Sequence, residues 1–316
     1  MTNTDLNFWD DYRFDYLAST KNKIEQWNGP DCEDNFKKVT KNNKFLTYGK
    51  DQFFYRRNSY GFRSENFDNN DPVKILYSGC SITEGVGLPV EHTWASFVNG
   101  FISKEIGKTP KMYNIGYGGF SIDAITRFTY LTIKNKIFVP DVVLLLLPSI
   151  TRSEILFQNS YNQIEMYGFI TTYDKFTDPI VKNIHSNYLK SFNPLHRLHE
   201  AFRNLLFLKL FLDSQNIPFY FYTWDTTKID FCNNKFLGFG DAMMLNAPKD
   251  LREHIIHSEF LQDEGVVLPN FERPFKQNIG RDGMHPGPNS HWNYSKTFYN
   301  KLRSREGFKK VMEKWK

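Results

Sequence analysis

The 316-residue sequence is poor in cysteine, with only Cys32, Cys80 and Cys232. An odd number of cysteines with no C-x-x-C spacing argues against a disulfide framework and against a zinc knuckle. The histidine pairs that stand three residues apart have no acidic partner of the H-E-x-x-H type, which argues against a catalytic metal. We therefore expect free thiols, no metal site and no cofactor.

Long apolar runs are absent as well. The segment from Val142 to Pro148 is one of the longest, whereas about 20 apolar residues are needed to cross a bilayer. The N-terminal residues lack the basic stretch followed by an apolar one that a secretory signal has. These absences predict a soluble, cytoplasmic protein with no membrane partner.

Basic residues are in slight excess over acidic ones. The formal net charge is +5, and much of the excess lies after Asn300. This pattern is typical of a solvated terminal helix, whereas nucleic-acid-binding proteins usually have a larger and more clustered excess. We expect no nucleic-acid partner.

From residue 73 onward, short apolar segments alternate with helical patterns. Residues 141–147 are continuously apolar, which is typical of a strand buried on both faces of a parallel sheet. The alternation predicts an α/β fold with a three-layer, doubly wound (flavodoxin-like) parallel sheet, whose ligand crevice lies at the carboxyl ends of the strands. The expected strands are 73–79, 111–115, 141–147 and 217–224, and the expected helices are 91–106, 122–136, 194–210 and 290–303.

Two parts of the chain fall outside this alternation. Residues 1–72 are expected to form an N-terminal extension that packs on the main domain, residues 73–316. Residues 152–192, approximately, are polar, aromatic and poorly periodic, and they predict an insertion over the strand ends. After Asp225 the pattern assigns no fifth strand.

A serine follows the first strand of the main domain. The turn Gly79-Cys80-Ser81 leads into a short helix, so the Ser81 hydroxyl can stand clear of the backbone near the amides of the helix start. Two more blocks are expected at the same crevice, Asn114-x-Gly-x-x-Gly-x-Ser121 and Asp282-Gly-Met-His-Pro-Gly287. In order and spacing the three blocks resemble those of the SGNH (GDSL) hydrolases.

The resemblance covers residues 73–300 and implies roles for four residues. Ser81 would attack an acyl carbonyl, His285 would remove its proton, and Asp282 would hold the imidazole in the useful tautomer. The backbone amides of Ser81 and Gly119 would form the oxyanion hole. Because a neutral imidazole must act as the base, activity is expected to rise with pH near the ordinary imidazole pKa of about 6.5.

The chain departs from the family pattern in two places. Cys80 stands where the first block usually has aspartate, and Ile150 stands where an asparagine usually follows the central strand. The family's side-chain donor to the oxyanion is therefore missing. Losing one such donor typically costs about 2.7 to 4 kcal/mol of transition-state stabilisation, which slows catalysis without abolishing it.

Three neighbours of Ile150 could replace the missing donor, namely Ser149, Thr151 and Arg152. We favour Arg152 as an oxyanion or substrate contact. The alternative for Arg152 is a salt bridge to Glu154 or to another acidic residue on the surface.

Two other interpretations of the first block stay open. Ser81 could be no more than a helix-cap serine, although its combination with Asp282 and His285 argues against this. Cys80 could be the nucleophile, but neighbouring residues on a strand point to opposite faces, so we expect Cys80 to be a buried thiol.

The resemblance implies a serine esterase that acts on small acyl esters through an acyl-enzyme intermediate, with acetylated glycans as one candidate substrate. A catalytically weak scaffold that binds glycans or forms part of a virus particle is one alternative. An O-acyltransferase that uses the same triad is another.

Overall fold

A computed structural model describes most of the chain. The sequence hypotheses on Ile150, Thr151 and Cys232 lie outside the described residues. The described residues are 20–41, 48–149, 152–158, 164–170, 179–191, 194–223, 229–230, 235–236, 265–267 and 278–316.

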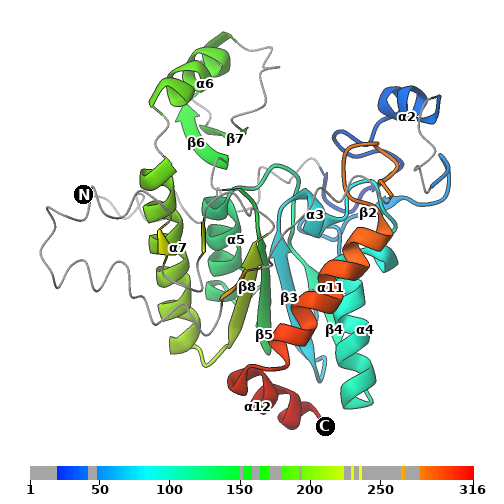
Figure 1. The fold of residues 1–316 in the computed structure, drawn as a ribbon, viewed down its shortest axis with the longest axis vertical. Coiled ribbons are helices and arrows are strands. Elements are labelled where there is room, and N and C mark those ends of the chain that lie inside the picture. The colour runs from blue at the N-terminus through cyan, green and yellow to red at the C-terminus, as the bar shows by residue number, and fades with distance from the viewer. Residues whose placement is uncertain are drawn as a thin grey trace, which may run out of the picture.

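A parallel sheet of five strands forms the centre of the molecule (Figure 1). Its order is β11-β8-β5-β3-β4, so the first strand in sequence lies between the second and the third. This is the order of a doubly wound sheet, and it confirms the predicted fold class. The sequence analysis did not assign β11. The strands are β3 (Lys74–Gly79), β4 (Lys111–Asn114), β5 (Val142–Leu147), β8 (Phe219–Thr223) and β11 (Gly265–Val267).

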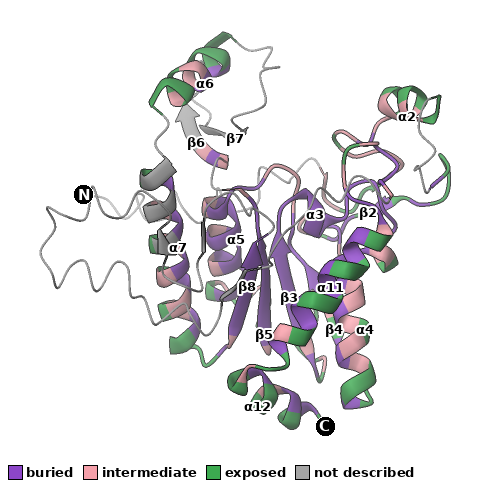
Figure 2. Ribbon diagram, in the orientation of Figure 1, coloured by how far each residue is buried: buried purple, intermediate pink, exposed green. Residues whose placement is uncertain are grey.

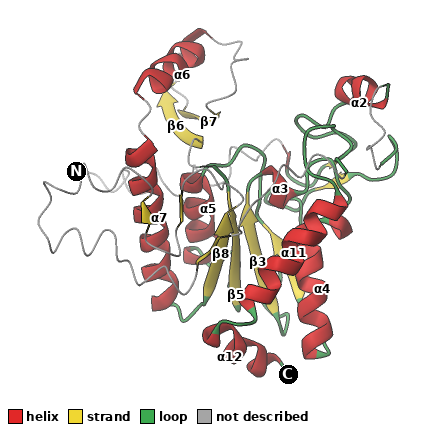
Figure 3. Ribbon diagram, in the orientation of Figure 1, coloured by secondary structure: helices red, strands yellow, loops and turns green. Residues whose placement is uncertain are grey.

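Helices cover both faces of this sheet, as Figures 1 and 3 show. On one face α4 packs against α11 and α12, and on the other α5 packs against α7. The three layers follow from the right-handed crossovers between parallel strands, which place successive helices on opposite faces once the strand order reverses. The helices are α4 (Trp94–Ile106), α5 (Ile122–Lys134), α7 (Pro194–Ser214), α11 (Pro288–Leu302) and α12 (Glu306–Trp315).

The core lies along the sheet, where the strands are buried almost throughout (Figure 2). Every residue of β5 is buried, as expected for a central parallel strand. Between the sheet and α11, the fully buried Trp94 packs edge-to-face against Tyr77, Tyr222 and Phe298. The opposite face is covered by α5, whose buried residues follow the predicted helical spacing from Ile122 onward.

The start of α4 differs from the prediction of a helix from residue 91. A 3₁₀ turn, η2 (Val90–His92), comes first, and the α-helix begins only at Trp94. The reason is local, because the Thr93 hydroxyl accepts from the Ser96 amide and thereby caps the helix. Ser121 caps α5 in the same way, since its hydroxyl accepts from the Ala124 amide.

The predicted insertion contains ordered elements of its own. The strands β6 (Arg152–Gln158) and β7 (Ile164–Ile170) pair antiparallel, separately from the main sheet, and α6 (Pro179–Ser191) follows them. Figure 1 shows these elements beyond the end of the sheet at which α3 (Ser81–Glu84) lies, which is the carboxyl end of β3.

The N-terminal part contributes a helix and a small sheet at the same end of the molecule (Figure 1). Helix α2 (Glu33–Thr40) follows β1 (Ile24–Glu25) in the sequence and precedes β2 (Tyr55–Arg56). The strands β1 and β2 pair antiparallel.

Two short strands, β9 (Ile229–Asp230) and β10 (Lys235–Phe236), form a further antiparallel pair. Within the described ranges, no helix has the length and apolar character that crossing a membrane would require.

Candidate active site

Ser81 is the first residue of α3, directly after the turn that ends β3. The turn is tightly packed. A Cβ added to Gly79 would lie 2.0 Å from Thr83 Oγ1 and 2.8 Å from the carbonyl oxygen of Leu146. Only glycine allows the strand and the helix to approach this closely. The Ser81 side chain therefore stands at the carboxyl edge of the sheet, where the fold class predicts a ligand crevice.

Three side chains form a hydrogen-bonded chain at this edge. His285 Nε2 lies 2.8 Å from Ser81 Oγ, and His285 Nδ1 lies 2.5 Å from Asp282 Oδ2. Ser81 and His285 are 204 positions apart in the sequence. The structure thus brings together the serine, histidine and aspartate that the sequence analysis singled out, in the order that the nucleophile, base and orienting acid of a triad require.

The turn from Asp282 to His285 is fixed by its own hydrogen bonds. Asp282 Oδ1 accepts from the backbone amides of Met284 and His285, each at 3.1 Å, while Oδ2 faces the imidazole. Burial raises the pKa of the Asp282 carboxyl, but the hydrogen bonds and charge of His285 outweigh it and leave the pKa lowered. Asp282 is therefore an ionised acceptor that keeps the imidazole proton on Nδ1 and leaves Nε2 free to accept from Ser81.

A buried ion pair anchors this turn to the N-terminal part of the chain. Arg281, directly before Asp282, and Asp31 are both fully buried, with 2.6 Å between Arg281 Nη2 and Asp31 Oδ2. The Tyr55 hydroxyl donates to the same Asp31 oxygen at 2.5 Å and accepts from the amide of Gly87 at 2.8 Å. Sequence reasoning missed Asp31 and Arg281, because buried charges 250 positions apart carry no local pattern.

The oxyanion hole expected from the sequence consists of the backbone amides of Ser81 and Gly119. Neither the Ser81 amide nor the Gly119 amide donates a hydrogen bond to any of the described residues. Gly119 has φ +84°, and a Cβ built on it would meet nothing within 4 Å, so the space beside this residue is open. Its neighbour Gly118 donates its amide to Glu84 Oε2 at 2.6 Å, which ties the glycine turn to α3.

The structure describes two of the three expected substitutes for the missing oxyanion donor, and Thr151 lies outside the described residues. Arg152 begins β6 and is half-buried, and its carbonyl accepts from Arg197 Nη2 at 2.9 Å. Glu154, the acid named as the alternative partner of Arg152, pairs instead with Arg127 at 2.7 Å. Ser149 is half-buried after β5. A role of Ser149 or Arg152 in the oxyanion hole stays a prediction.

Two buried residues, Cys80 and His291, are close in sequence to Ser81 and His285. Cys80 is a fully buried thiol, as the sequence analysis expects. His291 Nδ1 accepts from the backbone amide of Trp94 at 2.9 Å, and burial together with the charge of His285 lowers the pKa of His291 to about 3. Among the residues that the structure describes, no group of histidine, cysteine or acidic side chains could hold a metal ion.

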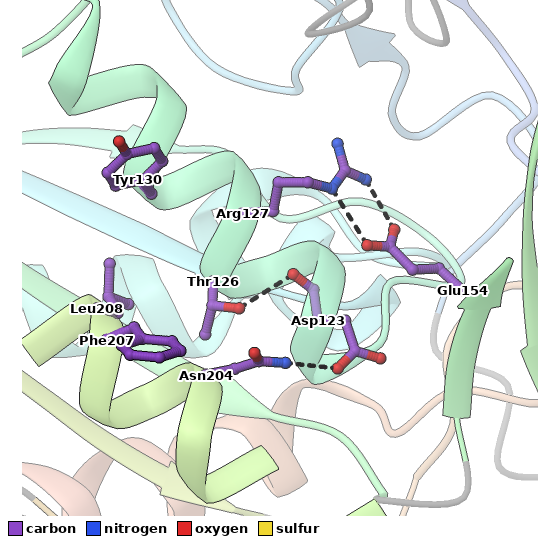
Figure 4. A pocket seen from close by; sticks show the side chains of 8 residues that line it. All are labelled: Asp123, Thr126, Arg127, Tyr130, Glu154, Asn204, Phe207 and Leu208. Atoms are coloured by element: carbon purple, nitrogen blue, oxygen red, sulfur yellow. Dashed lines mark hydrogen bonds and ion pairs between the residues drawn. The ribbon is translucent and has the colours of Figure 1, made fainter. Parts of the chain in front are cut away.

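A cavity of about 370 Å³ lies between α5 and α7 (Figure 4). Its charged groups are paired: Arg127 bonds to both carboxylate oxygens of Glu154, and Asp123 pairs with Arg197, outside the lining, at 2.7 Å. Asn204 Nδ2 also donates to Asp123 Oδ1, at 2.7 Å. The lining of this cavity does not include Ser81, Asp282 or His285. Its lining consists of Asp123, Thr126, Arg127, Tyr130, Glu154, Asn204, Phe207 and Leu208.

No protein-family model and no curated protein matches the chain. Among solved structures, the chain is similar to the psychrotrophic esterase EstA from Pseudoalteromonas sp. (13% identity, TM-score 0.42), over 75% of this chain and 98% of that one. It is also similar to AlinE4, an SGNH-hydrolase family esterase, with 16% identity and a TM-score of 0.35 over 75% of this chain and 98% of that one. A third similar structure is the acetylxylan esterase Axe2 from Geobacillus stearothermophilus, with 12% identity and a TM-score of 0.36 over 75% of this chain and 95% of that one. At these values, function has to be inferred from this chain's own residues.

Proposed function

We propose that the protein is a serine esterase of the SGNH type. The observation that carries the proposal is the chain of hydrogen bonds from Ser81 Oγ to His285 Nε2 and from His285 Nδ1 to Asp282 Oδ2, at 2.8 and 2.5 Å. A helix-cap serine has no need of a histidine that is itself oriented by a buried carboxylate. This arrangement is the one that activates a hydroxyl as a nucleophile.

In the acylation step, Ser81, His285 and Asp282 each have one role. Ser81 Oγ attacks the acyl carbonyl carbon as His285 Nε2 takes the hydroxyl proton, and Asp282 stabilises the resulting imidazolium. The carbonyl oxygen becomes an oxyanion that the amides of Ser81 and Gly119 can bind. When the intermediate collapses, the bond to the alcohol breaks, His285 returns the proton to the leaving oxygen, and the acyl group stays on Ser81.

Deacylation repeats the steps with water as the nucleophile. His285 removes a proton from water, the hydroxide oxygen attacks the acyl carbon, and the proton returns to Ser81 Oγ as the acid leaves. The atoms and electrons of acylation and deacylation balance without a metal or a redox step. If an alcohol of a sugar replaces water, the same residues transfer the acyl group, which would make the protein an O-acyltransferase.

The substrate class that we propose is a small acyl ester, with acetyl esters of glycans as the leading candidate. The open space beside Gly119 leaves room for an acyl group next to the proposed oxyanion donors. One similar solved structure is described as an acetylxylan esterase.

The decisive experiment compares the wild-type protein with Ser81→Ala in hydrolysis of p-nitrophenyl acetate and of acetylated xylan. Loss of the hydroxyl removes the nucleophile, so we expect kcat to fall by about 10³-fold or more while the unfolding midpoint stays near that of the wild type. Unchanged turnover by Ser81→Ala would falsify the assignment.

A serine-directed fluorophosphonate probe separates the esterase from a binding scaffold. Stoichiometric labelling at Ser81 is expected of a working triad. Absence of labelling in the folded wild-type protein would favour the catalytically weak scaffold, a reading motivated by the missing asparagine donor. Product analysis with and without a sugar acceptor distinguishes the esterase from the acyltransferase.

A further inference from the structure

Glu84 carries a buried carboxylate that the proposed reaction does not use. It is the last residue of α3, three positions after Ser81, and its side chain is 1% exposed. Its two oxygens face different parts of the molecule: Oε1 faces the N-terminal segment, residues 20–65, and Oε2 faces the glycine turn, residues 116–119. A carboxylate buried this completely is retained only where it is paired and hydrogen-bonded.

The N-terminal segment supplies two donors to this carboxylate. Arg57 Nη2 lies 2.9 Å from Glu84 Oε1, with the Arg57 side chain fully buried, and Asn28 Nδ2 donates to the same oxygen at 2.8 Å. Burial lowers the pKa of Arg57, but the charges of Glu84 and Tyr117 outweigh it and raise the pKa, so the guanidinium stays charged. These contacts hold the Glu84 carboxylate in one orientation.

The other Glu84 oxygen fixes the glycine turn. The amide of Gly118 donates to Glu84 Oε2 at 2.6 Å, and Gly119, next in the chain, has a φ of +84°. The Arg57 guanidinium also lies over the Tyr117 ring, 5.3 Å from its centroid. Glu84, itself held by Arg57 and Asn28, thus restrains the residue directly before Gly119, in addition to the bond that the Tyr117 amide donates to the Gly79 carbonyl at 3.1 Å.

We propose that Glu84 is a positioning residue for the oxyanion hole, and that the N-terminal segment belongs to the active site because it orients Glu84. The inference rests on the proposed esterase function. With the asparagine donor missing, the Ser81 and Gly119 amides bear the oxyanion, so a small displacement of Gly119 weakens transition-state binding more than substrate binding.

The test uses full-length variants and p-nitrophenyl acetate. Glu84→Gln keeps the shape of the side chain but presents an amide group to one set of its partners, so either Gly118 or the Arg57 and Asn28 donors lose their acceptor. We expect kcat to fall by about tenfold or more with KM within about twofold of the wild-type value. Asn28→Ala, which leaves Glu84 intact, should lower kcat in the same direction by a smaller factor.

Tyr113→Phe is the matched control, because it removes a hydrogen bond between β4 and Asp71 of the N-terminal part without touching Glu84 or Gly118. Its kcat should equal that of the wild type even if its unfolding midpoint falls. The proposal is overturned if folded Glu84→Gln keeps the wild-type kcat, or if Tyr113→Phe loses kcat to the same extent. If Glu84→Gln does not fold, Asn28→Ala decides in the same way.

The wild-type protein in this experiment separates the two proposals. A wild-type protein that neither turns over the ester nor reacts with the fluorophosphonate contradicts the esterase function. A wild-type protein that is active, together with Glu84 and Asn28 variants that keep its kcat, contradicts only the role of Glu84.

Discussion

His291 should make the protein lose stability as the pH falls below 6.5. In the folded state its ring is fully buried and Nδ1 accepts from the Trp94 amide, so the proton lies on Nε2 and the ring is neutral. Burial, with the nearby His285 charge, lowers the pKa of His291 to about 3, whereas an unfolded chain has an ordinary histidine pKa of about 6.5. Between pH 6.5 and about 3, His291 is therefore protonated in the unfolded state and neutral in the folded state.

The size of the effect follows from linkage. Below pH 6.5 the free energy of unfolding falls by about 1.4 kcal/mol for each pH unit on account of this one group. The interval down to pH about 3 amounts to at most about 5 kcal/mol, a large part of the 5 to 15 kcal/mol that typically stabilises a folded protein. Above pH 6.5 the group contributes no pH dependence, because it is neutral in both states.

His291→Asn tests this reasoning. The asparagine Oδ1 can take the place of Nδ1 as acceptor for the Trp94 amide, but it does not titrate. Urea unfolding from pH 7.5 to 4 should therefore give a shallower acid limb for His291→Asn than for the wild type. His196→Asn, which replaces a histidine whose side chain is 67% exposed, should leave the limb unchanged. Parallel acid limbs for His291→Asn and the wild type would refute the argument.

Two further substitutions test the base and its anchor. Asp282→Asn keeps the shape of the orienting side chain but favours the wrong imidazole tautomer, so kcat should fall by about 10⁴-fold while the circular dichroism spectrum is retained; a loss below about tenfold would contradict the role of Asp282. Asp31→Asn leaves the buried Arg281 guanidinium without its counter-charge and should lower the free energy of unfolding by about 3 to 5 kcal/mol in urea titration. A change below about 1 kcal/mol would mean that water or other groups compensate Arg281.

The fold could be predicted from the sequence as far as its periodicity was clean. The four predicted strands of the main sheet are all present, because each is a short apolar run followed by a turn or a helix cap. The fifth strand, β11, has three residues and pairs only with β8, so no pattern of useful length marks it. The pairing of β6 with β7 was also missed, since neither alternates polar and apolar residues regularly.

The candidate site divides in the same way. Ser81, Asp282 and His285 were predicted as a group because the order and spacing of their blocks resemble those of the SGNH (GDSL) hydrolases, and the structure brings the three side chains together. The residues that hold those blocks in place were not predicted. Glu84 lies three positions after Ser81, and Arg281 directly precedes Asp282. Their partners come from the N-terminal segment, and charged residues in a sequence are ordinarily expected to be exposed.

The buried charges around the site argue for geometry over stability. Replacing a buried ion pair by apolar residues of similar size is often neutral or stabilising, because removing two charges from water costs as much as their attraction returns. Each of the pairs Arg57–Glu84 and Arg281–Asp31 is nevertheless attached to a turn that carries a proposed catalytic group. Apolar packing could cover those turns, but it could not supply the directional acceptor that the Gly118 amide needs or fix the backbone before Asp282. We infer that both pairs hold the geometry of the proposed site.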